Sequence, residues 1–313
     1  MCLCRNAVVA GNRNRWPAAV PDAAETDPSP GLRPALGILA GGGKLPGRVA
    51  AAAQAGGREV FVVGLDGYAE PDVLAPFAHD WARLGAAGRI LALLRARRCR
   101  DVVLVGPVRR PSLLDLRPDA EGARLLARIG RAAFGGDDGL LAAIVRVLAE
   151  EGFRVLGAHE VLTEAVAPHG RLGRHAPDAQ AMADIARGVA VAAALGAVDV
   201  GQGCIVQQGI VLAVEAIEGT DAMLARAATL RRPGPGGVLV KLVKPGQERR
   251  ADLPTIGPAT IAAAAAAGLR GVAVEAGGTL LTDRAALVAA ADAAGLFLIG
   301  IDPVTHSDEE RTT

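Results

Sequence analysis

The chain has 313 residues, a net charge of +1 and 51% hydrophobic residues, but only 3% aromatic residues. This length predicts two domains, and the near-neutral charge with few aromatic rings argues against a nucleic-acid binder that works through a basic surface and base stacking. The longest charge-free stretches, Val200–Val214 and Leu253–Leu269, are shorter than the ~20 apolar residues that a membrane-spanning helix needs.

Both ends of the chain are expected to lie outside the folded part. Residues 1–31 are rich in proline and lack the apolar core of a secretory signal, so we interpret them as a flexible leader. Residues 306–313 are polar and are interpreted as a tail. The four cysteines, Cys2, Cys4, Cys99 and Cys204, follow no metal-ligand or disulfide spacing, which indicates a reducing compartment.

From residue 32 to residue 166, apolar runs alternate with helical segments. The expected strands are Leu36–Ala40, Glu59–Val63, Asp101–Val105 and Phe153–Leu156. The expected helices are Pro46–Ala55, Ile90–Arg97, Ala120–Ala133 and Gly139–Glu151. Continuous apolar strands between helices are typical of a parallel sheet that is covered on both faces. We therefore predict an open, Rossmann-like α/β domain that binds a nucleotide.

A second α/β domain is expected after a linker. Residues 167–177 contain two prolines, two histidines and two glycines without apolar periodicity, and we interpret them as the linker. The second domain, over residues 178–305, has five expected strands: Cys204–Gln208, Ile210–Glu215, Val238–Leu242, Val272–Glu275 and Leu296–Ile301. Its expected helices are Asp178–Leu195, Ala222–Thr229, Ala259–Ala267 and Asp283–Ala294.

A glycine-rich turn, Gly41, Gly42 and Gly43, follows the first expected strand and is succeeded by Lys44. Successive glycines allow the backbone to approach a ligand, and a helix that begins at Pro46 would direct free N–H groups at an anion. The turn is neither a P-loop nor a dinucleotide fingerprint, because its residue spacing differs from both. We expect it to bind a nucleotide or diphosphate, and the alternative is an ordinary tight turn.

Three carboxylates lie close together in the second domain. Glu215 ends an expected strand, and Glu218 and Asp221 lie at the turn into a helix. Mg²⁺ binds one or two carboxylates together with substrate phosphate, so we predict a metal site with Asp221 and Glu215 as ligands. Asp221 and Glu218 are the expected catalytic carboxylates, with Asp221 as the main one. The alternative is that Thr220 or Asp221 only caps the helix.

Lysine is rare in this chain, and its positions are informative. The sequence has 34 basic residues, but its only lysines are Lys44, Lys241 and Lys244, which all lie in glycine- or carboxylate-flanked segments. A compact ammonium group suits phosphate, although three residues can also cluster by chance. Arg109 follows an expected strand and is a candidate for substrate binding, or a surface charge. Asp137 begins an expected helix, as its cap or as a ligand-binding residue.

Six segments together resemble the LpxI family, the UDP-2,3-diacylglucosamine pyrophosphatases of lipid A biosynthesis. The matching stretches are LGILAGGGKLP (36–46), GPVRRP (106–111), GGDDGLL (135–141), QGIVLAVEAIEGTDAML (208–224), KLVKPGQERRADLPTIG (241–257) and GVAVEAGGTLL (271–281). The resemblance implies two domains with the substrate held between them, and hydrolysis that depends on Mg²⁺ or another divalent ion. The implied products are UMP and 2,3-diacylglucosamine 1-phosphate.

The resemblance also completes the set of expected site residues. Lys241 is expected to be catalytic, and Thr220, Lys244, Gln247 and Asp252 are expected to bind substrate. Glu248 stands where the family pattern has an aspartate, so it receives no metal-ligand role. A lipid substrate implies a cytoplasmic enzyme with transient contact at the inner face of the inner membrane, and a homo-oligomer is left open.

Two other functions are considered from the residues. A sugar nucleotidyltransferase has a similar glycine-rich start, Leu-Ala-x-Gly-x-Gly, but usually continues with Thr-Arg where this chain has Lys44-Leu45. A non-enzymatic nucleotide-sugar sensor would use the carboxylates only as caps. Turnover of UDP-diacylglucosamine with and without Mg²⁺ separates the three possibilities.

Overall fold

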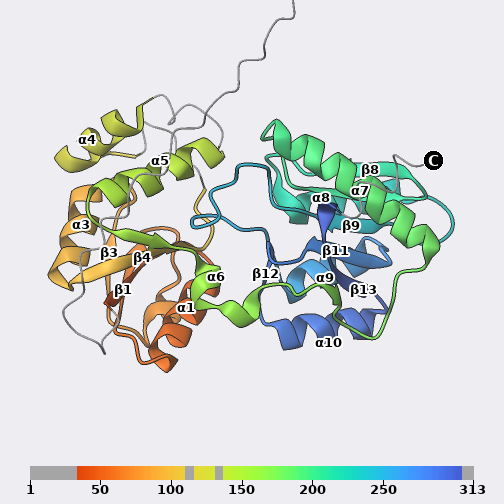
Figure 1. Ribbon diagram of the computed structural model, residues 1–313, viewed down its shortest axis with the longest axis horizontal. Helices are drawn as coiled ribbons and strands as arrows, with labels where there is room; N and C mark the ends of the chain where they lie inside the picture. The colour runs from red at the N-terminus through yellow and green to blue at the C-terminus, as the bar shows by residue number, and fades with distance from the viewer. Residues whose placement is uncertain (1–33, 110–115, 131–136, 305–313) are drawn as a thin grey trace, which may run out of the picture. The chain divides into compact units, whose positions relative to one another are not determined.

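The computed structural model describes residues 34–109, 116–130 and 137–304. Within these residues, the N-terminal part contains a five-stranded parallel sheet (Figure 1). Its strands in spatial order are β3 (His79–Ala82), β2 (Val60–Leu65), β1 (Ala35–Ala40), β4 (Cys99–Val105) and β5 (Arg154–Leu156). This order, 3-2-1-4-5, is that of a doubly wound sheet, which confirms the predicted Rossmann-like domain.

Helices cover both faces of this sheet. Val60 and Val62 of β2 pack in one core with α1 (Leu45–Ala55), α2 (Pro71–Leu74) and α6 (Ala158–Val161). The alternate residues Phe61 and Val63 pack in another core with the helices of the opposite face. Those helices are α3 (Ala87–Ala96), α4 (Ala120–Ile129) and α5 (Asp137–Glu150). Successive side chains of a strand point to opposite faces, so the apolar runs read from the sequence supply both cores.

The C-terminal part contains a six-stranded mixed sheet within the described residues. Its spatial order is β6 (Gly170–Arg171), β13 (Phe297–Ile301), β11 (Gly271–Glu275), β9 (Val238–Lys241), β7 (Gly203–Gln207) and β8 (Ile210–Val214). Strands β9, β11 and β13 are parallel, whereas β6, β7 and β8 pair in antiparallel fashion. The two-domain α/β fold class is thus confirmed, and the second sheet is mixed.

The helices of the C-terminal part also lie on both faces of their sheet. Helix α7 (Ala179–Ala197) packs on one face, and α8 (Gly219–Ala227), α9 (Pro258–Ala266) and α10 (Arg284–Ala294) share the core of the other. A small parallel pair, β10 (Thr255–Ile256) and β12 (Leu280–Leu281), and the 3₁₀ turns η2 (Thr163–Ala165) and η3 (Ala228–Leu230) complete the elements. No helix in the described residues is long and apolar enough to cross a membrane.

The segment predicted as a linker contains a short strand. Gly170 and Arg171 pair with β13, and the backbone N–H of Arg174 donates to the Asp292 carboxylate at 2.6 Å. A two-residue strand has no periodicity that a sequence pattern could reveal. Strand β3 was also missed, because it has four residues, HDWA, of which two are polar, and it lies at the sheet edge.

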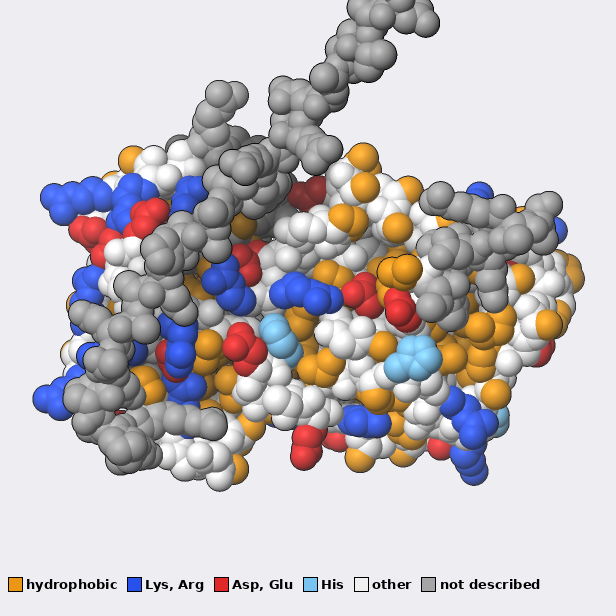
Figure 2. Space-filling model, in the orientation of Figure 1, with side chains coloured by type: hydrophobic (Ala, Val, Ile, Leu, Met, Phe, Trp, Pro, Cys, Tyr) orange, Lys and Arg blue, Asp and Glu red, His pale blue; other side chains and the backbone are white. Residues whose placement is uncertain are grey.

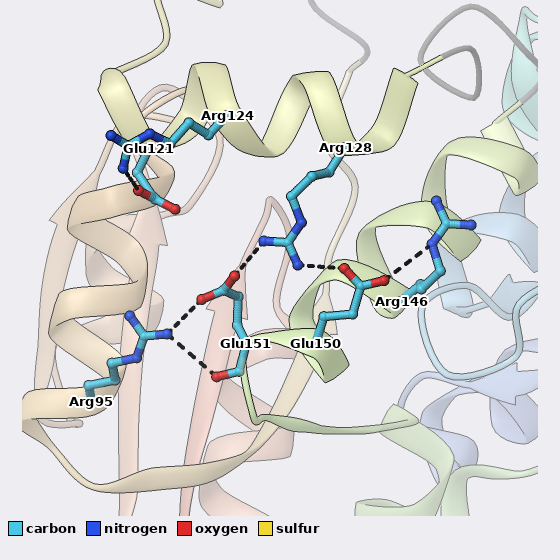
Figure 3. Close-up of polar contacts among 7 residues, drawn as sticks. All are labelled: Arg95, Glu121, Arg124, Arg128, Arg146, Glu150 and Glu151. Carbon is cyan, nitrogen blue, oxygen red and sulfur yellow. Dashed lines mark hydrogen bonds and ion pairs between the residues drawn. The ribbon is translucent and has the colours of Figure 1, made fainter. Parts of the chain in front are cut away.

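Charges of both signs are mixed on the surface. On the face drawn in Figure 2, basic and acidic side chains are interspersed over the described residues. Figure 3 shows one network in which Arg128 of α4 binds both Glu150 and Glu151 at 2.5 Å, and Arg95 of α3 binds Glu151 at 2.7 Å. These ion pairs link α3 and α4 to the end of α5.

The network predicts a pH-dependent contribution to stability. Hydrogen bonds from Arg128 and then Arg95 lower the pKa of Glu151 below its ordinary value of 4.5. Its stabilisation is therefore present above that value and is lost as the pH falls through the lower folded-state pKa. We expect Glu151→Gln to lower the Tm by roughly 2 °C at pH 7. This difference should shrink below about pH 4, as thermal denaturation across the pH range would show.

Glu121 provides the matched control for this experiment. Its carboxylate pairs with Arg124 three residues along the same helix, so it links no second element (Figure 3). Glu121→Gln should therefore have a smaller effect than Glu151→Gln at pH 7. Equal effects, or a Glu151→Gln difference that does not change with pH, would contradict the proposed contribution.

Candidate active site

The glycine turn lies where the strand order of the N-terminal sheet reverses. Such a switch point, beyond the carboxyl ends of β1 and β4, is where open α/β sheets bind ligands. The N–H of Gly41 donates to the carbonyl of Val105 at 2.8 Å, and that of Gly42 to Pro107 at 3.0 Å. The N–H of Gly43 donates to the Glu70 carboxylate at 3.2 Å. All three N–H groups of the turn thus have protein partners, and the expected binding of a nucleotide or diphosphate by this turn stays a prediction.

The turn predicts different outcomes for two neighbouring glycines. A Cβ on Gly41 would lie 2.4 Å from the carbonyl oxygen of Gly106, which is rigid backbone, whereas a Cβ on Gly42 has its nearest neighbour at 3.2 Å. We expect Gly41→Ala to lower the Tm by roughly 5 °C or more, because the β1 and β4 turns must separate. Gly42→Ala is the matched control and should change the Tm much less. Similar Tm values for both variants in thermal denaturation would show that the close approach is unimportant.

A cavity of about 590 Å³ lies beside the glycine turn, and basic side chains from both parts of the chain line it. Lys44 and Arg48 come from successive turns at the start of α1, and Arg249 and Arg250 come from the loop before β10. Arg249 pairs with Glu275 and Arg250 with Glu248. Within the described residues, neither Lys44 nor Arg48 forms an ion pair, and Nη1 of Arg48 is buried without a hydrogen-bond partner. This cavity, the basic pocket, therefore has two cations, Lys44 and Arg48, that form no ion pair within the described residues.

A second cavity of about 390 Å³, the carboxylate pocket, adjoins the first. Glu218, Thr220 and Asp221 line it from α8, and the start of α9 forms another wall. Thr255 and Thr282 line both cavities, so the two cavities are neighbours. The first turns of α8 and α9 thus meet the same space, and helix N-termini favour anions.

Helix α8 begins three residues earlier than predicted. Its N-cap residue is Glu218, whose side chain forms no capping hydrogen bond, and Gly219 has a φ of +79° that turns the chain into the helix. Thr220 and Asp221 therefore lie inside the first turn, so neither is the N-cap. This finding removes the purely capping interpretation of Asp221 and leaves its exposed carboxylate in the pocket.

The two carboxylates of α8 differ in their surroundings. A hydrogen bond from its own backbone N–H and one from Arg226 lower the pKa of Glu218, and Arg226 binds it at 2.5 Å. Glu218 is therefore an ionised, paired group. The carboxylate of Asp221 forms no hydrogen bond or ion pair with any other described residue and is the available carboxylate of the pocket.

Few carboxylates of the site are available as ligands for Mg²⁺. Among the described residues, no three His, Cys, Asp or Glu side chains are grouped as a metal site. Mg²⁺ commonly uses one or two carboxylates together with substrate phosphate and water, and Asp221 meets that requirement. Glu215 does not, because its two oxygens lie 3.2 and 3.5 Å from Lys241 Nζ and one also accepts from Thr220. The arrangement speaks against the expected role of Glu215 as a metal ligand.

Of the other expected site residues, some line the pockets and others do not. Asp252 lines the basic pocket and accepts a hydrogen bond of 2.6 Å from Gln247, which also accepts from the backbone N–H of Lys244. Lys244 pairs with Asp199 at 2.6 Å. Arg109 is exposed and lines neither pocket, and its carbonyl accepts from Tyr68. Asp137 begins α5, and its side chain lies outside the described residues.

Sequence reasoning missed several residues that line the pockets. Arg48 follows Lys44 by four residues, a spacing that places both on one helix face and that a helical reading of α1 could have revealed. Thr255 begins the short strand β10 and Thr282 follows the short strand β12, and strands of two residues have no periodicity that the sequence could reveal.

A doubly wound α/β domain with a basic pocket beyond the carboxyl ends of its strands has the arrangement that is typical of proteins that bind phosphorylated ligands. Comparison with known proteins identifies the family. The LpxI N-terminal domain matches residues 35–165, and the LpxI C-terminal domain matches residues 168–299. The chain is 47% identical over 274 residues to the UDP-2,3-diacylglucosamine pyrophosphatase LpxI of Caulobacter vibrioides, covering 86% of this chain and 98% of that protein. The chain belongs to the LpxI family, as the sequence motifs indicated.

Proposed function

We propose that this protein hydrolyses the diphosphate of UDP-2,3-diacylglucosamine in lipid A biosynthesis. The observation that carries the proposal is that the basic pocket and the carboxylate pocket are neighbours, since Thr255 and Thr282 line both of them. The 47% identity to a UDP-2,3-diacylglucosamine pyrophosphatase supports the substrate class. In the reaction, the oxygen of water bonds to one phosphorus and the bridging P–O bond breaks. The products are UMP and 2,3-diacylglucosamine 1-phosphate, and a proton is released.

The residues of the basic pocket would neutralise the diphosphate. Lys44 and Arg48 form no ion pair within the described residues, so they are the cations most available to the phosphate oxygens. Charge-assisted hydrogen bonds of this kind are about twice as strong as neutral ones. Arg249 and Arg250 add positive charge to the same pocket, although each is shared with a glutamate.

The residues of the carboxylate pocket would orient the reacting phosphate. We assign Asp221 as the carboxylate that would hold Mg²⁺, an ion that commonly uses one or two carboxylates together with phosphate oxygens and water. A bound Mg²⁺ supplies charge neutralisation at a phosphoryl group. The N-terminal turns of α8 and α9 face the same space and add favourable backbone dipoles.

The experiment follows both products from purified UDP-2,3-diacylglucosamine with Mg²⁺ and with a chelator. The proposal expects UMP and the lipid phosphate in equal amounts, with the rate restored when Mg²⁺ is returned. A nucleotidyltransferase would instead form UTP from the substrate when pyrophosphate is supplied. A sensor would bind the substrate without releasing UMP. Either result would replace the proposed function.

A further inference from the structure

A buried ion pair lies behind the wall of the carboxylate pocket. Lys241 at the end of β9 is 4% exposed, and Glu215 after β8 is 6% exposed. Neither side chain lines either pocket. The two groups meet across β7, where Gly203 is opposite Lys241 and its carbonyl accepts from the N–H of Glu215. A Cβ on Gly203 would lie 3.0 Å from Glu215 Oε2, so glycine leaves room for the carboxylate.

Thr220 connects this pair to the pocket. Its Oγ1 lies 2.5 Å from Lys241 Nζ and 2.5 Å from Glu215 Oε1. An ammonium group only donates hydrogen bonds and an ionised carboxylate only accepts them. The hydroxyl of Thr220 must therefore accept from Lys241 and donate its single proton to Glu215. Both partners set the orientation of the Thr220 hydroxyl. Toward the pocket this hydroxyl can only accept a hydrogen bond, because its single proton is already donated.

We propose that Lys241 and Glu215 are positioning residues that hold Thr220, and with it the first turn of α8, so that Asp221 faces the substrate. Thr220 and Asp221 are adjacent in that turn, so a fixed Thr220 side chain restricts the backbone that carries Asp221. Burying two charges is costly, and this pair is satisfied only in the arrangement that also binds Thr220. The inference rests on the proposed function of Asp221, and it replaces the expected roles of Lys241 in catalysis and Glu215 in metal binding.

The test compares variants that remove the contact between Thr220 and the buried ion pair in two different ways. Thr220→Val removes the hydroxyl and keeps the shape. Lys241→Met combined with Glu215→Gln removes both buried charges together, which avoids leaving one of them unpaired. Amide hydrogen exchange over residues 219–223 reports the first turn of α8, and kcat and KM report the reaction. Asp101→Asn is the control, because Asp101 is an equally buried carboxylate in the other sheet and lines neither pocket.

Both sets of variants should speed exchange over residues 219–223 by roughly tenfold and lower kcat by roughly tenfold to a hundredfold, with less than about a threefold change in KM. Thr220→Ser, which keeps the hydroxyl, should recover most of the lost kcat. Combining Thr220→Val with the double variant should cost no more than either alone, because all three act through one link. The Asp101→Asn control should lower stability but leave exchange over residues 219–223 unchanged.

Two results would overturn the positioning role. One is unchanged exchange over residues 219–223 in Thr220→Val. The other is additive losses of kcat, which would mean that Lys241 or Glu215 acts on the substrate directly. A failure of the proposed function looks different. In that case amide exchange over residues 219–223 would become faster while kcat stayed normal. This result would support the contact between Thr220 and the buried pair, and it would reject Asp221 as the carboxylate that the reaction needs.

Discussion

Replacing Asp221 with alanine should lower kcat on the order of a thousandfold, because in the proposed function this carboxylate would hold the Mg²⁺ that neutralises charge on the phosphoryl oxygens. Asp221 is the available carboxylate of the pocket, since Glu218 is bound by Arg226 and Glu215 by Lys241. Substrate binding should largely survive, because the cations that would hold the diphosphate line the adjoining basic pocket. Asp221→Asn keeps the shape but loses the charge, so we expect a similar loss.

The structure also predicts that folding tolerates these changes. Asp221 is exposed and is not the N-cap, so its contribution to stability is limited to about 0.3–1 kcal/mol from the helix dipole. Asp72 is a suitable control, because it is an exposed carboxylate in the first turn of α2 and lines neither pocket. Measurements of kcat, KM and Tm for these variants decide whether Asp221 acts in the reaction or only in stability. Near-normal kcat in both Asp221 variants, or an equal loss in Asp72→Ala, would reject the assignment.

The fold was predictable wherever an element was long enough to show its pattern. Strands β1, β2 and β4 are buried on both faces. Because of this burial they contain continuous apolar runs in the sequence, and such runs predicted the strands. Strands of two residues, such as β6, offer no period to read. The start of α8 was misplaced because Gly219 looks like a turn residue, although its positive φ leads directly into the helix.

The site was only partly predictable for a different reason. Glu218, Thr220 and Asp221 could be predicted as one site because they are neighbours in the chain, and they do line one pocket. Glu215 and Lys241 are 26 residues apart, and they meet only because β7 pairs with both β8 and β9. Composition shows that lysines are rare, but it cannot show that one of them faces a buried carboxylate.

The largest loss of stability is expected at the amino ends of the N-terminal strands, where Asp101 is 2% exposed. Arg154 binds its carboxylate with two hydrogen bonds of 2.7 Å, and Arg58, which is 9% exposed, forms a second ion pair with it. Asp101→Ala would leave the Arg58 charge buried without a partner, which should cost roughly 3 kcal/mol of unfolding free energy. Arg154→Ala is the comparison, because Arg154 is 67% exposed and Arg58 would still neutralise Asp101. Its loss should stay below about 1 kcal/mol. Urea denaturation of the two variants measures both values, and equal losses would mean that the burial of Arg58 is not the cause.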